Sequence, residues 1–226
     1  MMRHVHTLAL TGLMSTTAAL AQSGTATWQV SADDGATWAS QVQLAQAATV
    51  RVRILFAWSG IPTAYGFAGS LFDGIIQGAS ASDSVSDIRR PVPFNFAINL
   101  LAATRYTDGI KIDKADDLAL PGHGTGWVNP GQTSPDTGPP FFSSSNPAAV
   151  FTYSLHVSAD QGTRTISNVF PSTGLFALSE YTSDAGAQLR FNPDRVDLNS
   201  ATITVIPAPS TAAFIALSCL GNRRRR

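Results

Sequence analysis

Apolar and polar residues alternate along much of this chain with the period of two that is typical of β-strands. In residues 49–58, Arg51 and Arg53 share one face before the run becomes continuously apolar, as expected for a strand that enters a core. Residues 150–158 also alternate, with Phe, Tyr, Leu and Val on one face. The second half shows no helical period between such segments, so the pattern predicts an all-β fold.

Turn-forming residues separate the strand-like segments at short intervals. Residues 65–76 fit two strands or one strand with a glycine-loosened bend, residues 78–87 fit a polar loop, and a helix over 96–104 competes with a strand over 94–101. Short strands at this spacing predict a single antiparallel β-sandwich or jelly-roll-like domain. The expected strands are residues 25–30, 38–44, 49–58, 65–76, 94–101, 150–158, 163–169, 175–181, 187–191 and 196–205.

A long segment rich in glycine and proline, residues 121–147, interrupts this series and favours no regular structure. It contains Trp127, Phe141 and Phe142, large apolar groups that a solvated linker does not need. We interpret it as a crossover held against the sandwich by those rings. The alternative is a recognition loop whose rings, with Trp58, stack on a carbohydrate.

Both ends of the sequence differ from the body between them. Residues 1–21 have a weakly positive start, a mostly small and apolar stretch and a final Ala-Leu-Ala, which together predict a secretory signal peptide. The β domain is expected over residues 22–206. Residues 207–226 form a tail of Pro-Ala-Pro, a short apolar run that holds the only cysteine, and four arginines. The body therefore has no disulfide.

Charge is unevenly distributed along the 226 residues, although the formal net charge is zero. Ten of the fifteen basic residues and all fifteen acidic residues lie in the body, which gives it a net charge of −5. Such a body offers no basic patch for a phosphate backbone, so nucleic-acid binding is not expected. Charged residues make up only 13% of the chain, and this composition is closer to that of an extracellular β protein than of a cytosolic enzyme.

The first two expected strands are joined by residues 31–38, which match the pattern S-x-D-x-G-x-T-W. This segment resembles an Asp-box, the hairpin turn that is repeated in sialidase propellers and occurs singly in other β folds. An Asp carboxylate that accepts turn amides and a glycine with positive φ explain the pattern locally. Since one copy is present, we expect a structural hairpin and no sialidase.

Few residues of the body could support catalysis or bind a metal. His123 lies in the long loop and His156 on the polar face of a strand, and no nucleophile, zinc or phosphate-loop signature accompanies them. We therefore expect no enzyme activity. Four aspartates lie close together in the sequence: Asp108, Asp113, Asp116 and Asp117. This acidic group fits a solvated turn. The alternative is a structural calcium site, and no other cofactor is expected.

The tail resembles the PEP-CTERM sorting signal of exported bacterial proteins, in the variant with Ala in place of the central Glu. Pro207, Ala208 and Pro209 correspond to the motif, the apolar run to the helix, and Arg223, Arg224, Arg225 and Arg226 to the basic end. The resemblance implies an exosortase-type processing enzyme as a partner and transient anchoring in a membrane through the tail. The apolar run of about twelve residues is shorter than the roughly twenty that span a bilayer.

These features predict an exported, non-catalytic protein of the cell surface or the extracellular matrix, sorted through its tail and associated with extracellular polysaccharide. A carbohydrate-binding module is the alternative, and a secreted hydrolase is a further one. The hydrolase requires His123 or His156 within hydrogen-bond reach of a serine and an aspartate, or paired carboxylates in a cleft.

Overall fold

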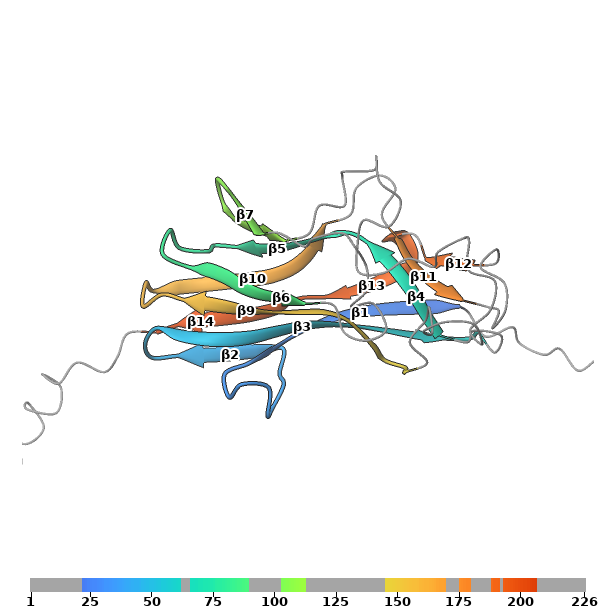
Figure 1. The fold of residues 1–226 in the computed structure, drawn as a ribbon, viewed down its shortest axis with the longest axis horizontal. Coiled ribbons are helices and arrows are strands. Elements are labelled where there is room, and N and C mark those ends of the chain that lie inside the picture. Colours follow the sequence, from blue (N-terminus) through green and yellow to red (C-terminus); the bar gives the residue numbers. More distant parts are fainter. Residues whose placement is uncertain are drawn as a thin grey trace, which may run out of the picture.

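The computed structural model describes residues 22–61, 66–89, 103–112, 145–169, 175–179, 188–191 and 193–206. In these ranges the chain forms strands and one short 3-10 turn, η3 (Pro193–Arg195), arranged as in Figure 1. The all-β prediction is confirmed. The predicted signal peptide and tail lie outside the described residues, as do the strand predicted over 94–101 and most of the long loop.

One layer is a five-stranded sheet with its longest strand in the middle. Three of its four pairings are antiparallel, and β13 joins β1 in parallel. In spatial order its strands are β13 (Val196–Asn199), β1 (Ser23–Ser31), β3 (Ala48–Ser59), β9 (Ala148–Val157) and β6 (Ser84–Arg89).

The second layer is a six-stranded sheet, and a smaller three-stranded sheet completes the described fold. In the six-stranded sheet β2 joins β14 in parallel and the other pairings are antiparallel. Its strands are β2 (Gln41–Leu44), β14 (Ala201–Val205), β10 (Gly162–Val169), β5 (Asp73–Gln77), β8 (Gly109–Ile112) and β7 (Ala103–Tyr106). The small sheet consists of β12 (Gln188–Phe191), β11 (Leu175–Ser179) and β4 (Gly66–Leu71).

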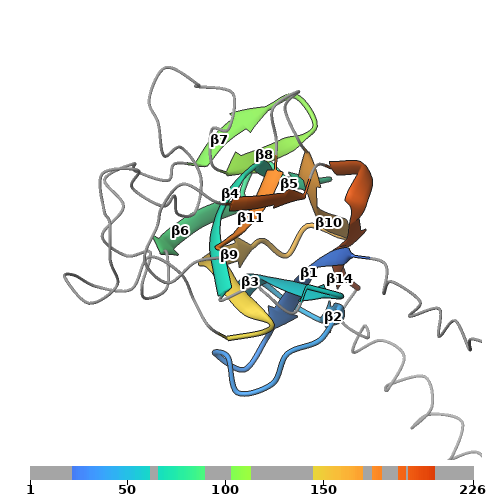
Figure 2. The same ribbon diagram turned by 90° about the vertical axis from the view of Figure 1, so that its right-hand side faces the viewer.

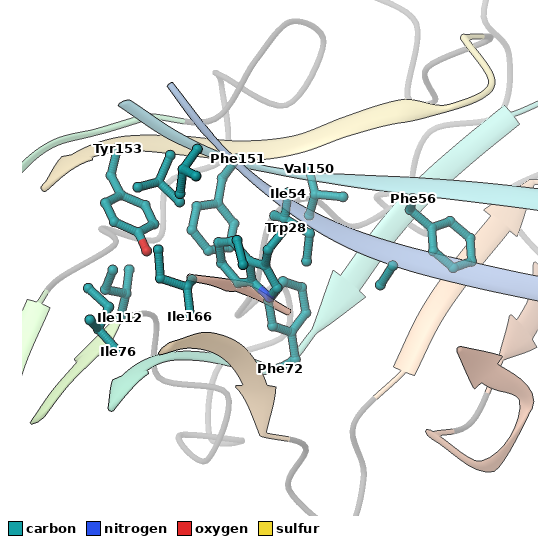
Figure 3. Packing of buried hydrophobic residues seen from close by; sticks show 14 of the residues in the cluster. Trp28, Ile54, Phe56, Phe72, Ile76, Ile112, Val150, Phe151, Tyr153 and Ile166 are labelled. Carbon is teal, nitrogen blue, oxygen red and sulfur yellow. The ribbon is translucent and has the colours of Figure 1, made fainter. Parts of the chain in front are cut away.

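Viewed along the long axis of the molecule, the strands of the two larger sheets surround a common interior (Figure 2). Trp28 lies there, with its ring edge-on to Phe72 and Phe151 at centroid distances of 6.5 and 5.5 Å. Ile76 and Ile166 of the six-stranded sheet close the same cluster (Figure 3). Aromatic pairs in this geometry contribute about 0.5–1.5 kcal/mol beyond their burial.

The small sheet extends the core beyond the end of the six-stranded sheet. Phe56 of β3 stacks on Phe176 of β11, with ring centroids 4.4 Å apart and planes within 4°. Phe67 of β4 and Phe191 of β12 also pack against the Phe56 ring. The long strand β3 therefore joins two parts of one core.

The predicted Asp-box hairpin forms as a turn, but its two strands do not continue as a pair. Val30 and Ala39 exchange both backbone hydrogen bonds, at 2.8 and 3.0 Å. Beyond this bridge the chain crosses to the six-stranded sheet, where β2 buries Leu44 and pairs with β14. The hairpin prediction is therefore wrong for residues 41–44, because their partner is a distant strand.

The strand predicted over residues 196–205 is also two strands. β13 and β14 lie in different sheets, and the chain crosses between them at Ser200. Val196 is buried in the first strand, whereas Ala201 and Ile203 are buried in the second. The break in alternation at Ser200 marks the crossing.

Two segments without a strand prediction contain strands. β6 begins within the predicted polar loop and covers its last four residues, and β7 and β8 form a hairpin around Asp108, the first residue of the acidic group. Most side chains of β6, and all four of β7, are exposed. Since neither strand has one buried face and one solvent-exposed face, the sequence shows no alternation of apolar and polar residues there.

Candidate functional site

The Asp-box turn satisfies its own polar groups. The Asp33 carboxylate accepts hydrogen bonds from the Ser31 hydroxyl (2.6 Å), the Thr37 amide (2.9 Å) and the Thr37 hydroxyl (2.6 Å). The bonds from Ser31 and Thr37 lower the pKa of Asp33 from 3.8 to about 2. Gly35 has the positive φ that the sequence predicted, +93°. Ser31, Asp33, Gly35 and Thr37 of the motif bond to one another within the turn, which makes it a structural element.

The outer face of the five-stranded sheet carries a network of charges centred on Arg51. Its guanidinium donates to Asp34 (2.9 Å), to Asp87 (3.4 Å) and to the Ser154 hydroxyl (2.9 Å). The bond to Asp34 raises the pKa of Arg51. Arg89 binds the other oxygen of Asp87 at 3.0 Å. The network connects the Asp-box turn to the edge strand β6.

His156, one of the two histidines considered for catalysis, lies on this face. Its Nε2 is 2.7 Å from the Ser86 hydroxyl, and its Nδ1 is 3.0 Å from the Thr49 hydroxyl. A nucleophilic serine needs a histidine oriented by a carboxylate. Among the described residues that third position is occupied by Thr49, a neutral hydroxyl, and His123 lies outside them.

A buried ion pair that the sequence did not reveal lies at one end of the sandwich. Arg164 of β10 points inward and binds Asp83 through Nε–Oδ2 (2.9 Å) and Nη2–Oδ1 (3.3 Å). The Ser80 and Ser158 amides donate to the same carboxylate at 2.8 and 2.7 Å. Burial opposes ionisation of Asp83, but the bonds from Arg164 and the two serines leave its pKa below the usual value.

The remaining donors of Arg164 bind neighbouring loop atoms. Nη1 donates to the carbonyl oxygens of Asp160 (2.7 Å) and Gly162 (3.2 Å), and the Asp160 carboxylate accepts from Ser80 and Ser158. The pair thereby joins the turn after β5 to the turn after β9. This cluster is saturated by internal bonds and therefore stabilises the loops.

The predicted carbohydrate-stacking residues can be located only in part. Trp58 is half-buried at the end of β3, where its ring stacks on Phe56 at 6.3 Å and its backbone binds the Asn146 side chain. Trp127, Phe141 and Phe142 lie outside the described residues. Trp58 therefore contributes to the core, and carbohydrate stacking by the four residues stays a prediction.

The predicted metal site can likewise be located only through Asp108. This residue is exposed in the turn between β7 and β8, and its carbonyl accepts the Gly78 amide at 3.0 Å. Asp113, Asp116 and Asp117 lie outside the described residues. Within the described ranges, no three His, Cys, Asp or Glu residues are grouped closely enough to hold a metal. The described part of the chain also contains no helix with the length and apolarity to cross a membrane.

Part of the outer surface of the six-stranded sheet carries neutral polar side chains. Thr163 is paired in register with Thr204, and Thr165 with Thr202, which creates a two-by-two array of threonines on β10 and β14. Glutamines flank this array on β2 and β5. We call these seven outward-facing residues the hydroxyl–amide face: Gln41, Gln43, Gln77, Thr163, Thr165, Thr202 and Thr204.

Three solved structures illustrate what the described fold is similar to. The seventh ScaB type I cohesin from Pseudobacteroides cellulosolvens is 10% identical, with 75% of this chain and 90% of that chain covered and a TM-score of 0.41. CaCohA2 from Clostridium acetobutylicum is 14% identical, with 81% and 92% covered and a TM-score of 0.41. A type I cohesin–dockerin complex from Clostridium thermocellum matches at 13% identity, 80% and 99% coverage and a TM-score of 0.40.

At these TM-scores the likeness carries no argument about what this chain binds. No protein-family model and no curated protein matches the chain. The function of this chain must therefore be inferred from its own residues.

Proposed function

We propose that the chain is an exported, non-catalytic protein of the cell surface or exopolysaccharide matrix, sorted through its C-terminal tail. An exosortase-type enzyme would process the tail, and the apolar run would anchor the chain in the membrane until then. The observation that carries the proposal is the junction between domain and tail. Ile206 still donates its amide to Leu44 at 2.9 Å, and the Pro-Ala-Pro motif begins at the next residue.

The register of the strands supports a display role. Ser23, at the start of β1, is paired with Ser59, whereas Val205, at the end of β14, is paired with Gly162. Since β9 ends and β10 begins beside Val205, the tail leaves from the end opposite to the start of β1. A tail anchored in a membrane would hold one end of the sandwich close and direct the other outward.

The polar clusters support a non-catalytic function. Asp33, Arg51 and Asp83 each use their side chains in bonds that stabilise turns or connect strands. Catalytic groups, by contrast, lie in a concave pocket within reach of a substrate. Within the described residues, the serine–histidine contact open to the hydrolase alternative is Ser86–His156, which lies on an exposed sheet face, and His123 lies outside them.

The cellular location of the chain and the mass of its mature form test the proposal. We expect the full chain, expressed in a bacterium with an exosortase, to reach the envelope or medium with a C-terminus shorter than Arg226. Replacing Arg223, Arg224, Arg225 and Arg226 with glutamine should leave export intact and block processing. A soluble cytosolic chain that retains Arg226 and residues 1–21 would overturn the proposal.

A further inference from the structure

One row of outward positions crosses all six strands of the six-stranded sheet and ends at an aromatic ring. Each position is the direct register partner of the next, so the row follows from the pairing of the strands. Its members, from edge to edge, are Gln41, Thr202, Thr165, Gln77, Gly109 and Tyr106. With about 4.8 Å between strands, five steps give a row of roughly 24 Å.

The row carries no formal charge. An ion pair on the same sheet, Lys111 with Asp73, has its Nζ and Oδ2 atoms 2.6 Å apart and adds no net charge. The outer face of the five-stranded sheet differs, since it holds Arg51, Asp34 and Asp87. The two large faces of one molecule therefore offer different chemistry.

Tyr106 supplies the apolar surface at the end of the row. The residue is 39% exposed, and its hydroxyl lies 3.1 Å from the position that a Cβ at Gly109 would occupy. That Cβ would also lie 2.0 Å from the Ile76 carbonyl oxygen, so only glycine fits there. The absence of a side chain at 109 leaves room for the Tyr106 hydroxyl beside β8.

We propose that the hydroxyl–amide face, with Tyr106, binds an uncharged polysaccharide. Threonine hydroxyls and glutamine amides each donate and accept hydrogen bonds, as sugar hydroxyls do. Covering neutral groups costs less desolvation than covering charges, which favours a neutral polymer over an anionic one. The tyrosine ring offers an apolar surface for the C–H face of a sugar. This inference rests on the proposed function, because it identifies what the matrix protein would hold.

Affinity electrophoresis of the full chain tests the proposal, with dextran as the neutral probe and alginate as the anionic one. We expect dextran to retard the wild-type chain and alginate to retard it much less. Tyr106→Ala should weaken the dextran interaction roughly fivefold, because stacking is lost. Thr165→Glu should weaken it roughly tenfold, because a carboxylate at the centre of the face would be buried without a partner. Tyr106→Phe keeps the ring and should retain most of the binding.

Thr25→Glu is the matched control, since it adds the same charge at a half-exposed position on the outer face of the five-stranded sheet. It should leave retardation unchanged, and near-UV circular dichroism should show that all variants are folded. Lack of retardation by dextran, stronger retardation by alginate, or an equal effect of Thr25→Glu would overturn the assignment. Loss of dextran binding in a variant that is still exported and processed would leave the proposed function intact. A chain that stays in the cytosol but binds dextran would contradict the proposed function and leave the dextran-binding assignment intact.

Discussion

Arg164 and Asp83 form a bidentate ion pair inside the molecule, with side chains 1% and 0% exposed. Arg164 is also the register partner of Ile203 in the last strand, and Gly162 is the partner of Val205. The pair therefore stabilises the end of the sandwich from which the tail leaves. Buried pairs of this kind contribute little relative to apolar residues of the same shape, but removing one partner is costly.

Arg164→Met should lower the free energy of unfolding by about 3–5 kcal/mol, because the Asp83 carboxylate stays buried without its cation. Urea unfolding of the full chain at pH 7 measures this. Arg89→Met is the control, since Arg89 is 70% exposed and its ion pair contributes at most about 1 kcal/mol. The double variant Asp83→Leu/Arg164→Met should recover much of the loss. Equal effects of Arg164→Met and Arg89→Met would contradict a structural role for the buried pair.

Acid should destabilise the fold through the same carboxylate. The folded-state pKa of Asp83 is below its ordinary value, so the unfolded chain takes up its proton first as the pH decreases. The contribution is complete above the unfolded pKa of about 4 and is lost as the pH falls through the folded value. The stability that Asp33 contributes, with its folded pKa of about 2, should be lost in the window from about pH 4 to 2. Urea midpoints between pH 7 and 2.5 measure the slope, which should be smaller in Asp83→Asn. An unchanged slope would show that other groups dominate.

Much of the fold could be predicted from local alternation. Strand β3 buries Val50, Val52 and Ile54 and leaves the positions between them half-buried, so the sequence contains its own signal. The crossing at Ser200 and the parallel pairings of β13 and β2 depend on contacts between distant residues. The local pattern does not specify those contacts.

The outer surfaces and the buried Arg164–Asp83 pair were less predictable, because they also depend on contacts between residues far apart in the sequence. Arg164 precedes buried Ile166 by two positions, so alternation alone could have placed it on the core face. Its partner Asp83 lies 81 residues earlier in a serine-rich turn, and no local pattern connects them. Tyr106 belongs to the row on the six-stranded sheet only through the pairing of β5, β8 and β7.

Tyr153→Phe should stabilise the protein. The Tyr153 hydroxyl is buried and has no hydrogen-bond partner among the described residues, and burial raises its pKa well above the usual value. An unpaired buried hydroxyl costs about 1–3 kcal/mol of desolvation, so its removal should raise the free energy of unfolding by about 1 kcal/mol. Urea unfolding tests this, with exposed Tyr106→Phe expected to change stability by less than about 0.5 kcal/mol. A destabilised Tyr153→Phe would mean that the hydroxyl has a partner in the folded protein.

The junction between sheet and tail leads to a prediction about processing. Because the Ile206 amide is bonded to the Leu44 carbonyl, the proposed processing enzyme would have to bind a motif that starts at the first residue beyond the sheet. Proteases act on exposed, extended chain, and residues held in a sheet must first detach. Inserting Gly-Ser between Ile206 and Pro207 should therefore speed conversion to the mature form, followed by pulse labelling and mass spectrometry. The same insertion between Gln46 and Ala47, in the exposed connection from β2 to β3 at the same end, should leave the rate unchanged. If the tail insertion slows processing or has no effect, the end of the sandwich does not limit access to the motif.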